Sequence, residues 1–167
     1  MEVKFLGTVS PYCKDEKNCP GYLVTNGKEK ILLDCGNGVT RNLKLPDDLE
    51  NLTIIISHLH KDHYGDLLTL GYASYVFHNL GYLLNRIKVY IPEPDMYTVS
   101  EGYTDDEGWG ASRLVKKALI DYEFLQKFGE EQYFEFITYD ENTKLEVGNL
   151  HVSFSKNPHQ IKTYSTK

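Results

Sequence analysis

The ten residues at 57–66 hold a dense group of side chains that can bind metal. Within this stretch lie three of the six histidines of the chain and two carboxylates: His58, His60, Asp62, His63 and Asp66. Imidazole nitrogens and carboxylate oxygens are ligands that Zn²⁺ commonly takes in proteins. The residue types and their spacing therefore predict a metal site here.

A short apolar run at residues 52–56, rich in isoleucine, comes directly before this group. A run of this kind predicts a strand that is covered on both faces, which would deliver the polar residues at its carboxyl end. Residues two apart in an extended segment point the same way, so His58 and His60 can share one cation. Asp62 and His63 are adjacent and must point elsewhere, which suits a second cation nearby.

The pattern H-x-H-x-D-H after a hydrophobic strand resembles the signature of the metallo-β-lactamase superfamily of metal-dependent hydrolases. Residues 3–8, 21–24 and 31–36 are similar to the opening of the branch that contains tRNase Z and its smaller phosphodiesterase relatives. The resemblance runs nearly from end to end. It implies an α/β (α+β) fold, the metallo-β-lactamase-like αββα sandwich, with residues 1–167 forming a single domain that contains mainly the first βα half.

The resemblance also implies a set of site residues. Residues 156–165 resemble the motif in which a histidine lies between a strand and an aromatic-centred strand, so His159 is expected to join His58 and His60 around the first metal. Asp62, also assigned to catalysis, and His63 would hold the second. The family's bridging aspartate, last histidine and leaving-group acid belong to its second half. Because the sequence ends at Lys167, we expect a domain that lacks this portion.

Two further aspartates are expected to support the site. The resemblance makes Asp34 a candidate to orient a ligand histidine by accepting its other ring proton. A turn-capping role for Asp34 is an equally open alternative. Asp66 precedes an apolar helical segment at residues 67–84, so we expect it to cap that helix, with the helix dipole facing the site.

Three imidazoles with one open position favour a hydrolytic zinc site, at which metal-activated hydroxide is available near pH 7; manganese is an alternative metal. Two cations suit a phosphodiester, whose transition state spreads negative charge over several oxygens. The prediction is a metal-dependent phosphodiester hydrolase. Two alternatives stay open: ester, lactone or thioester hydrolysis, and a catalytically incomplete metal-binding half-domain.

Composition limits the classes of substrate and partner that the sequence favours. The net charge is -6 and no Lys/Arg run is longer than Lys116-Lys117, which argues against a broad surface for nucleic acid but leaves room for a local basic groove. The expected substrate is therefore either a small-molecule or a nucleic-acid phosphodiester. No apolar stretch has the length of a membrane span and no signal peptide is evident, so we expect a cytoplasmic protein with no membrane partner. A half sandwich would expose an apolar sheet face or an unpaired edge, which motivates the hypothesis of a homodimer.

The remaining elements follow from periodicity. Strands are predicted at residues 2–6, 22–25, 30–34, 87–91, 133–139, 144–147 and 150–154, helices at 39–44 and 113–128, and a surface loop at 97–110. An odd count of three cysteines argues against a disulfide framework. Cys13 and Cys19 could ligate a structural zinc, but no partner pair is evident, and Cys35 is expected to be a small buried hydrophobe.

Overall fold

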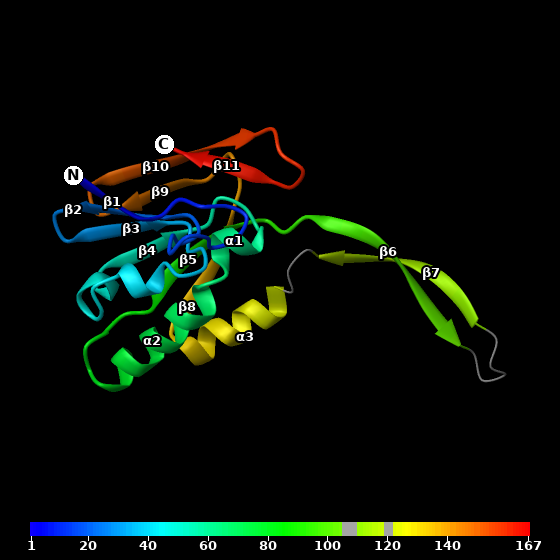
Figure 1. Cartoon of the computed structure of the whole chain (residues 1–167), viewed down its shortest axis with the longest axis horizontal. Helices are drawn as coiled ribbons and strands as arrows, with labels where there is room; N and C mark the ends of the chain where they lie inside the picture. The colour runs from blue at the N-terminus through cyan, green and yellow to red at the C-terminus, as the bar shows by residue number, and fades with distance from the viewer. Residues whose placement is uncertain (105–109, 119–121) are drawn as a thin grey trace.

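The computed structural model describes residues 1–104, 110–118 and 122–167, with side chains described outside residues 97–124. The chain is layered (Figure 1): a three-stranded sheet lies over one face of a six-stranded sheet, and helices α2 (Leu67–Asn79) and α3 (Tyr122–Gln132) cover the other. The hairpin of β6 (Met96–Thr104) and β7 (Gly110–Ala118) extends away from these layers. The predicted mixed α/β fold class is confirmed.

The six-stranded sheet has the order β1-β2-β3-β4-β5-β8. Its strands are β1 (Glu2–Gly7), β2 (Gly21–Asn26), β3 (Glu29–Leu33), β4 (Leu52–Ile55), β5 (Ile87–Pro92) and β8 (Phe134–Tyr139). The first three strands are antiparallel, whereas β3, β4, β5 and β8 run parallel to one another. The carboxyl ends of these four strands therefore meet at one edge of the sheet.

The smaller sheet is antiparallel, in the order β11-β10-β9. Its strands are β9 (Lys144–Val147), β10 (Leu150–Asn157) and β11 (Thr163–Thr166). Val147 pairs with Leu150 across a two-residue turn, whose Gly148 has φ +59°. Such a positive φ is what a tight hairpin turn requires and glycine supplies at low cost.

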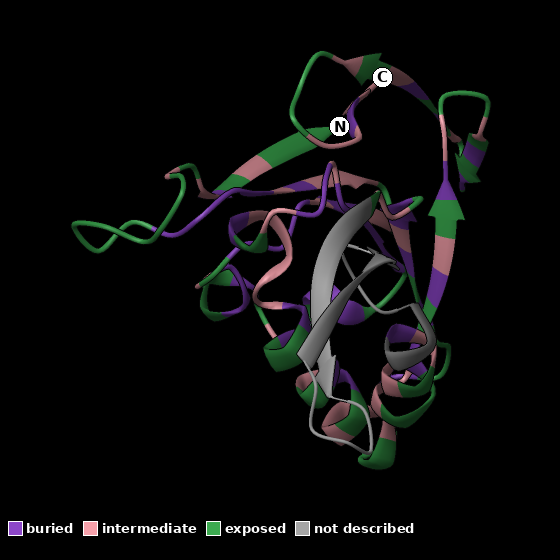
Figure 2. Ribbon diagram, turned by 90° about the vertical axis from the view of Figure 1, so that its right-hand side faces the viewer, coloured by how far each residue is buried: buried purple, intermediate pink, exposed green. Residues whose placement is uncertain are grey.

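The β4 strand divides its side chains between two apolar cores. Ile54 faces the helical layer and packs with Leu32 and Val89, whereas Ile55 faces the smaller sheet and packs with Ile31. This alternation follows from the two-residue side-chain period of a strand. Figure 2 shows that buried residues concentrate in the strands between the layers, while the outer helix faces are exposed. β4 is thus held on both faces, as its apolar sequence predicts.

Short helical elements complete the fold: α1 (Lys61–Tyr64) and the 3₁₀ turns η1 (Thr40–Asn42) and η2 (Asp47–Leu49). The helix predicted at residues 39–44 is therefore only a 3₁₀ turn. The loop predicted at residues 97–110 is also wrong, because β6 and the first residue of β7 occupy its described part; residues 105–109 lie outside the described residues. The helix predicted at 113–128 is β7 as far as Ala118, and α3 begins only at Tyr122. Pairing with β6 along nine register positions overrides the helical spacing of residues 113–118.

Candidate metal centre

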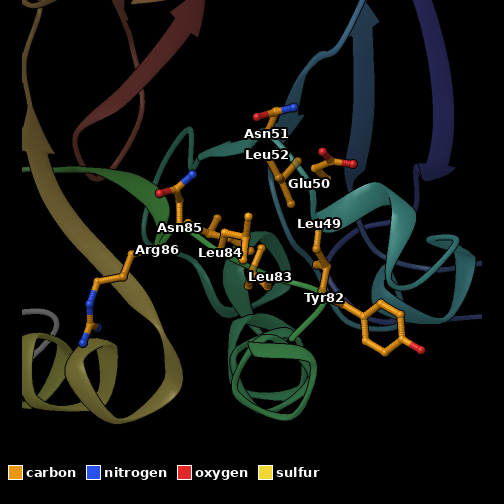
Figure 3. A pocket seen from close by; sticks show the side chains of 10 residues that line it. Leu49, Glu50, Asn51, Leu52, Tyr82, Leu83, Leu84, Asn85 and Arg86 are labelled. Carbon is orange, nitrogen blue, oxygen red and sulfur yellow. The ribbon is translucent and has the colours of Figure 1, made fainter. Parts of the chain in front are cut away.

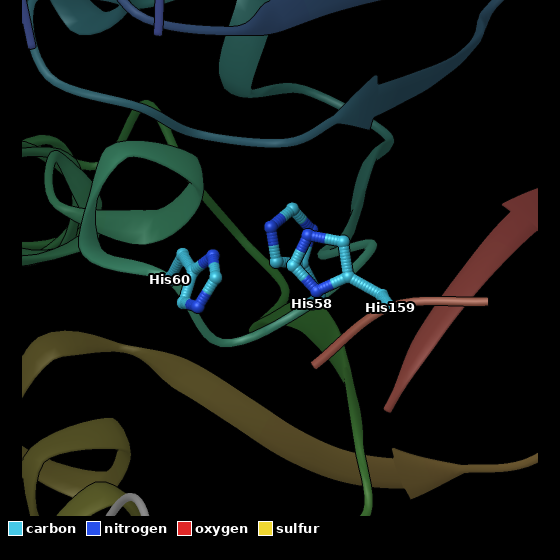
Figure 4. A group of neighbouring side chains, drawn as sticks. All are labelled: His58, His60 and His159. Carbon is cyan, nitrogen blue, oxygen red and sulfur yellow. The ribbon is translucent and has the colours of Figure 1, made fainter. Parts of the chain in front are cut away.

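Three histidines from two distant parts of the chain converge beyond the carboxyl end of β4 (Figure 4). One ring nitrogen from each of His58, His60 and His159 lies within 4.8 Å of the other two. His58 is buried, His60 is half-buried and His159 is exposed, so the group faces outward from the strand edge. Nitrogen donors gathered in this way match the ligand chemistry of zinc.

The loop between β10 and β11 carries His159, and two hydrogen bonds join this loop and the start of β11 to residues that follow β4 and β5. The amide of Tyr164 donates to the carbonyl oxygen of Ser57 over 3.1 Å, which joins the start of β11 to the end of the β4 segment. The amide of Lys162 donates to Oδ2 of Asp95 over 2.6 Å. These bonds bring a residue about a hundred positions away next to the H-x-H pair.

Asp62 and His63 lie in α1, beside the three histidines. The ring centroids of His58 and His63 are 3.9 Å apart, and Nε2 of His63 lies 3.5 Å from Oδ2 of Asp62. Asp62 is 7% exposed, so its carboxylate is almost withdrawn from solvent. A carboxylate oxygen and an imidazole nitrogen thus form a second pair of donors adjacent to the first group.

Asp34 lies behind His63 and makes a network of short hydrogen bonds. Its Oδ2 is 2.7 Å from Nδ1 of His63, and its Oδ1 accepts a hydrogen bond from the amide of Ser57 over 2.7 Å. The hydroxyl of Ser57 donates to Oδ2 over 2.9 Å and lies 3.0 Å from Nδ1 of His58. With Nδ1 engaged on both rings, Nε2 is the nitrogen left for a cation on each.

Asp66 occupies the position before α2, but the predicted capping bond is absent, since its side chain makes no hydrogen bond to the first turn of the helix. Its Oδ2 instead accepts a hydrogen bond from the amide of Thr40 over 2.7 Å. The carboxylate therefore joins the η1 turn to the start of α2. The competing partner from 26 positions away could not be anticipated from local sequence.

Ser10 is a residue of the site that sequence reasoning missed. It lies in the irregular segment between β1 and β2, and its hydroxyl donates to Oδ2 of Asp62 over 2.7 Å. Burial raises the pKa of Asp62, but the Ser10 hydrogen bond, a backbone hydrogen bond and the nearby His63 together hold it below its ordinary value. A serine 52 positions away carries no local signal for this contact.

The ring of His58 is held neutral. Burial, with a smaller contribution from His63, lowers its pKa to about 4. A neutral imidazole retains the lone pair that a metal ligand needs. At neutral pH, therefore, no proton has to be displaced from His58 before it can bind a cation.

The other histidines and the cavity in Figure 3 lie apart from this centre. The ring of His78 stacks on Tyr133 at 3.5 Å, and the side chain of His151 is 81% exposed. The cavity, of about 130 Å³, is lined by residues around Leu52 and Ile87, which begin β4 and β5. It thus lies at the opposite end of these strands from the histidines.

A model of the family described as Anti-Pycsar protein Apyc1 matches residues 1–167, which is the whole chain. The chain belongs to this family. The metallo-β-lactamase superfamily and its tRNase Z branch, which the opening motifs resemble, are confirmed by relatives of both kinds.

One relative is the probable metallo-hydrolase YhfI of Bacillus subtilis, which is 23% identical over 168 residues, or 100% of this chain and 58% of that protein. A ribonuclease Z of Archaeoglobus fulgidus is 36% identical over 74 residues, covering 42% of this chain and 24% of that protein. These names describe the two relatives. The two matches support a metallo-hydrolase superfamily for the chain.

Solved structures show the same fold. The crystal structure of YhfI matches with a TM-score of 0.73 over 98% of this chain and 56% of that one, at 23% identity. The short form of human tRNase Z matches with a TM-score of 0.61 over 98% of this chain and 63% of that one, at 19% identity. The chain therefore spans little more than half the length of YhfI.

None of the helices in the described ranges combines the length and the apolar character needed to cross a lipid bilayer.

Proposed function

We propose that the chain belongs to a metal-dependent hydrolase of phosphodiester bonds, with His58, His60 and His159 as the first group of metal ligands and Asp62 and His63 as the second. The observation that carries the proposal is the convergence of three histidine nitrogens within 4.8 Å beyond β4. The phosphodiester part of the proposal rests on the tRNase Z relatives and on the similar structure of a diphosphatase from the PhnP family.

The donor set fits a zinc-like cation. The first group supplies only imidazole nitrogens, and the second adds one carboxylate and one imidazole, a mixture that zinc and manganese both accept. The chemistry such cations supply when bound is Lewis acidity, which acidifies water and neutralises charge on phosphoryl oxygens.

The chain's own residues would position these ligands and set their protonation. Asp34 fixes the ring of His63 through Nδ1, and the hydroxyl of Ser57 lies against Nδ1 of His58. Ser10 donates to Asp62, which favours the ionised carboxylate over the protonated one. Ligands oriented in this way lose less conformational entropy when a cation binds, so the site is preorganised.

The bridging aspartate, last histidine and leaving-group acid implied by the family resemblance are not assigned to any residue of the 167. The homodimer hypothesis, which is motivated by an exposed sheet face or edge, is also part of the proposal. The activity, substrates and partners of the whole protein are accordingly part of the proposal.

A panel of chromogenic bis-aryl phosphodiesters and carboxylic esters, assayed with zinc and with manganese, tests the reaction class. We expect turnover of phosphodiesters that is lost in His58→Ala and retained in His151→Ala, a matched change of an exposed histidine. Turnover restricted to carboxylic esters would favour the ester, lactone or thioester alternative and contradict the phosphodiester proposal.

A second candidate function is that of a metal-binding half-domain without catalysis. One observation favours it. Among the described residues, the group of at least three potential metal ligands consists of His58, His60 and His159 and includes no carboxylate that could bridge two cations. Metal binding without turnover of any substrate in the panel would support it.

A further inference from the structure

The cysteine pair Cys13 and Cys19 lies outside the ligand set, in the segment that leads from β1 to β2. Their Sγ atoms are 3.6 Å apart. A tight turn brings them together: the backbones of Lys14 and Lys17 form an antiparallel bridge, with hydrogen bonds of 3.3 and 2.9 Å, so the chain folds back on itself between the two cysteines.

The two thiols differ in access to solvent. Cys13 is exposed, whereas Cys19 is buried with 0% of its surface accessible. The amide of Cys19 donates to the carbonyl oxygen of Asn37 over 3.0 Å, which fixes its position. Burial and the neighbouring Cys13 raise the pKa of Cys19 to about 11, so at neutral pH it is a poor nucleophile toward reagents in bulk water.

A structural zinc at this pair is not supported. A zinc site needs about four ligands. Among the residues with described side chains, only His58, His60 and His159 form a group of three or more potential metal ligands, and neither cysteine belongs to this group. Two thiols in contact, one of them exposed, instead have the arrangement of an attacking and a resolving cysteine.

We propose that Cys13 and Cys19 are a redox modification site, at which a low-molecular-weight disulfide of the glutathione type oxidises the pair to a reversible intramolecular disulfide. The exposed Cys13 thiolate attacks one sulfur of the external disulfide, which forms a mixed disulfide and releases one thiolate. The Cys19 thiol, whose Sγ lies 3.6 Å from that of Cys13, then gives up its proton to solvent and attacks the sulfur of Cys13, which releases the second thiolate. In balance, two protein thiols and one external disulfide become one protein disulfide and two external thiols, a two-electron oxidation of the protein.

The modified segment also contributes to the candidate metal centre. This segment, residues 8–20 between β1 and β2, includes Ser10, which donates to Asp62 and lies three positions before Cys13. Cys13 Sγ donates to the carbonyl oxygen of Asn37 over 3.1 Å, and this bond is lost when the thiol is oxidised. Oxidation would therefore alter the segment that holds the Asp62 carboxylate, while leaving all the proposed ligands chemically unchanged.

The test uses the whole chain in buffers of reduced and oxidised glutathione, quenched with acid, alkylated and digested with trypsin without reduction. Trypsin cuts after Lys14 and Lys17, so residues 5–14 and 18–28 stay joined only if Cys13 is bonded to Cys19. We expect this joined pair in oxidising buffer and its loss in reducing buffer. Cys35, which is 0% exposed, should remain a free thiol and serves as the internal control.

Two variants separate the steps. In Cys19→Ser, glutathione should remain on Cys13, because the resolving thiol is gone. In Cys13→Ser, a change at an exposed position, Cys19 should take up no glutathione from the folded protein. Free Cys13 and Cys19 at every glutathione ratio, glutathione that persists on Cys13 of the unmodified sequence, or a bond to Cys35 would each overturn the proposal.

Discussion

Nδ1 of His63 lies 2.7 Å from Oδ2 of Asp34, and the same carboxylate also holds the amide and hydroxyl of Ser57. Asp34 has φ 59°, in the left-handed region that asparagine and aspartate tolerate better than other residues with a side chain. One aspartate that follows β3 thus fixes both Ser57, just beyond β4, and His63 in α1. Its charge and its backbone conformation can be separated by experiment.

Asp34→Asn retains the backbone preference and removes the charge. We expect zinc affinity to fall about 10- to 100-fold, because the hydrogen bond that orients the proposed ligand His63 is weakened. Competition with a colorimetric chelator measures this. Asp15→Asn, at an exposed position that also has positive φ (51°), is the matched control and should bind as the parent does. Equal affinities in all three proteins would contradict the role of Asp34.

Ser10→Ala removes the hydrogen bond to Asp62. The pKa of Asp62 should rise, because the bond from Ser10 stabilises its ionised form. Because this bond orients a proposed ligand, the affinity for the cation proposed at Asp62 and His63 should fall about tenfold or more. Isothermal titration with zinc measures the loss. Ser153→Ala, at an exposed serine of β10, should cause none.

Gly36→Ala should weaken metal binding, because Gly36 packs closely against the backbone of Asp62. A Cβ at Gly36 would overlap the backbone oxygen of Asp62 and crowd the Cβ of Cys19, and neither atom belongs to a flexible side-chain end. We expect a lower zinc stoichiometry together with a lower unfolding midpoint. Gly27→Ala, in an open turn with φ +66°, should cost stability of about 1 kcal/mol without changing zinc binding. Unchanged zinc binding in the Gly36 variant would show that the contact is not required.

Tyr139→Phe tests the hydrogen bond between β8 and Ile56, the residue that follows β4. The Tyr139 hydroxyl is buried and donates to the carbonyl oxygen of Ile56 over 2.8 Å. Its loss leaves that oxygen without this partner, so the free energy of unfolding should fall by about 1–2 kcal/mol in urea denaturation. Tyr12→Phe, at an exposed tyrosine, should be neutral within about 0.5 kcal/mol.

The same tyrosine makes a prediction about alkaline pH. Burial, with contributions from Asp34 and Tyr164, raises the pKa of Tyr139 above its ordinary value of 10.0. The folded state therefore keeps a proton that the unfolded state loses, so this contribution to stability is complete below pH 10 and falls as the pH rises. The stability difference between the parent and Tyr139→Phe should narrow above pH 10, whereas a constant difference would contradict the assignment.

The sequence predicts best where local pattern and long-range packing agree. The apolar run at residues 52–56 forms β4, and the helix and strand expected after it are α2 and β5, with β5 parallel to β4. The convergence of His159 with His58 and His60 also follows the motif resemblance. In these cases the residues that form an element also determine which face it buries.

The failures have a common physical cause, which is a partner far away in the chain. Residues 113–118 have helical spacing but pair with β6, and Asp66 bonds Thr40 rather than its own helix. Ser10 approaches Asp62 only after β1 and β2 fold beside the site. Short-range propensity is weak compared with such contacts, and a single sequence gives no measure of them.

Metal content per chain is the most direct test of the central claim that His58, His60 and His159 bind a cation. Protein purified without added metal should contain about one zinc or manganese ion, or more, per chain, both as the parent and as His151→Ala. His159→Ala, which removes one ligand at an exposed loop, should retain less than about a tenth of that amount. Equal metal in His159→Ala and His151→Ala would contradict the account.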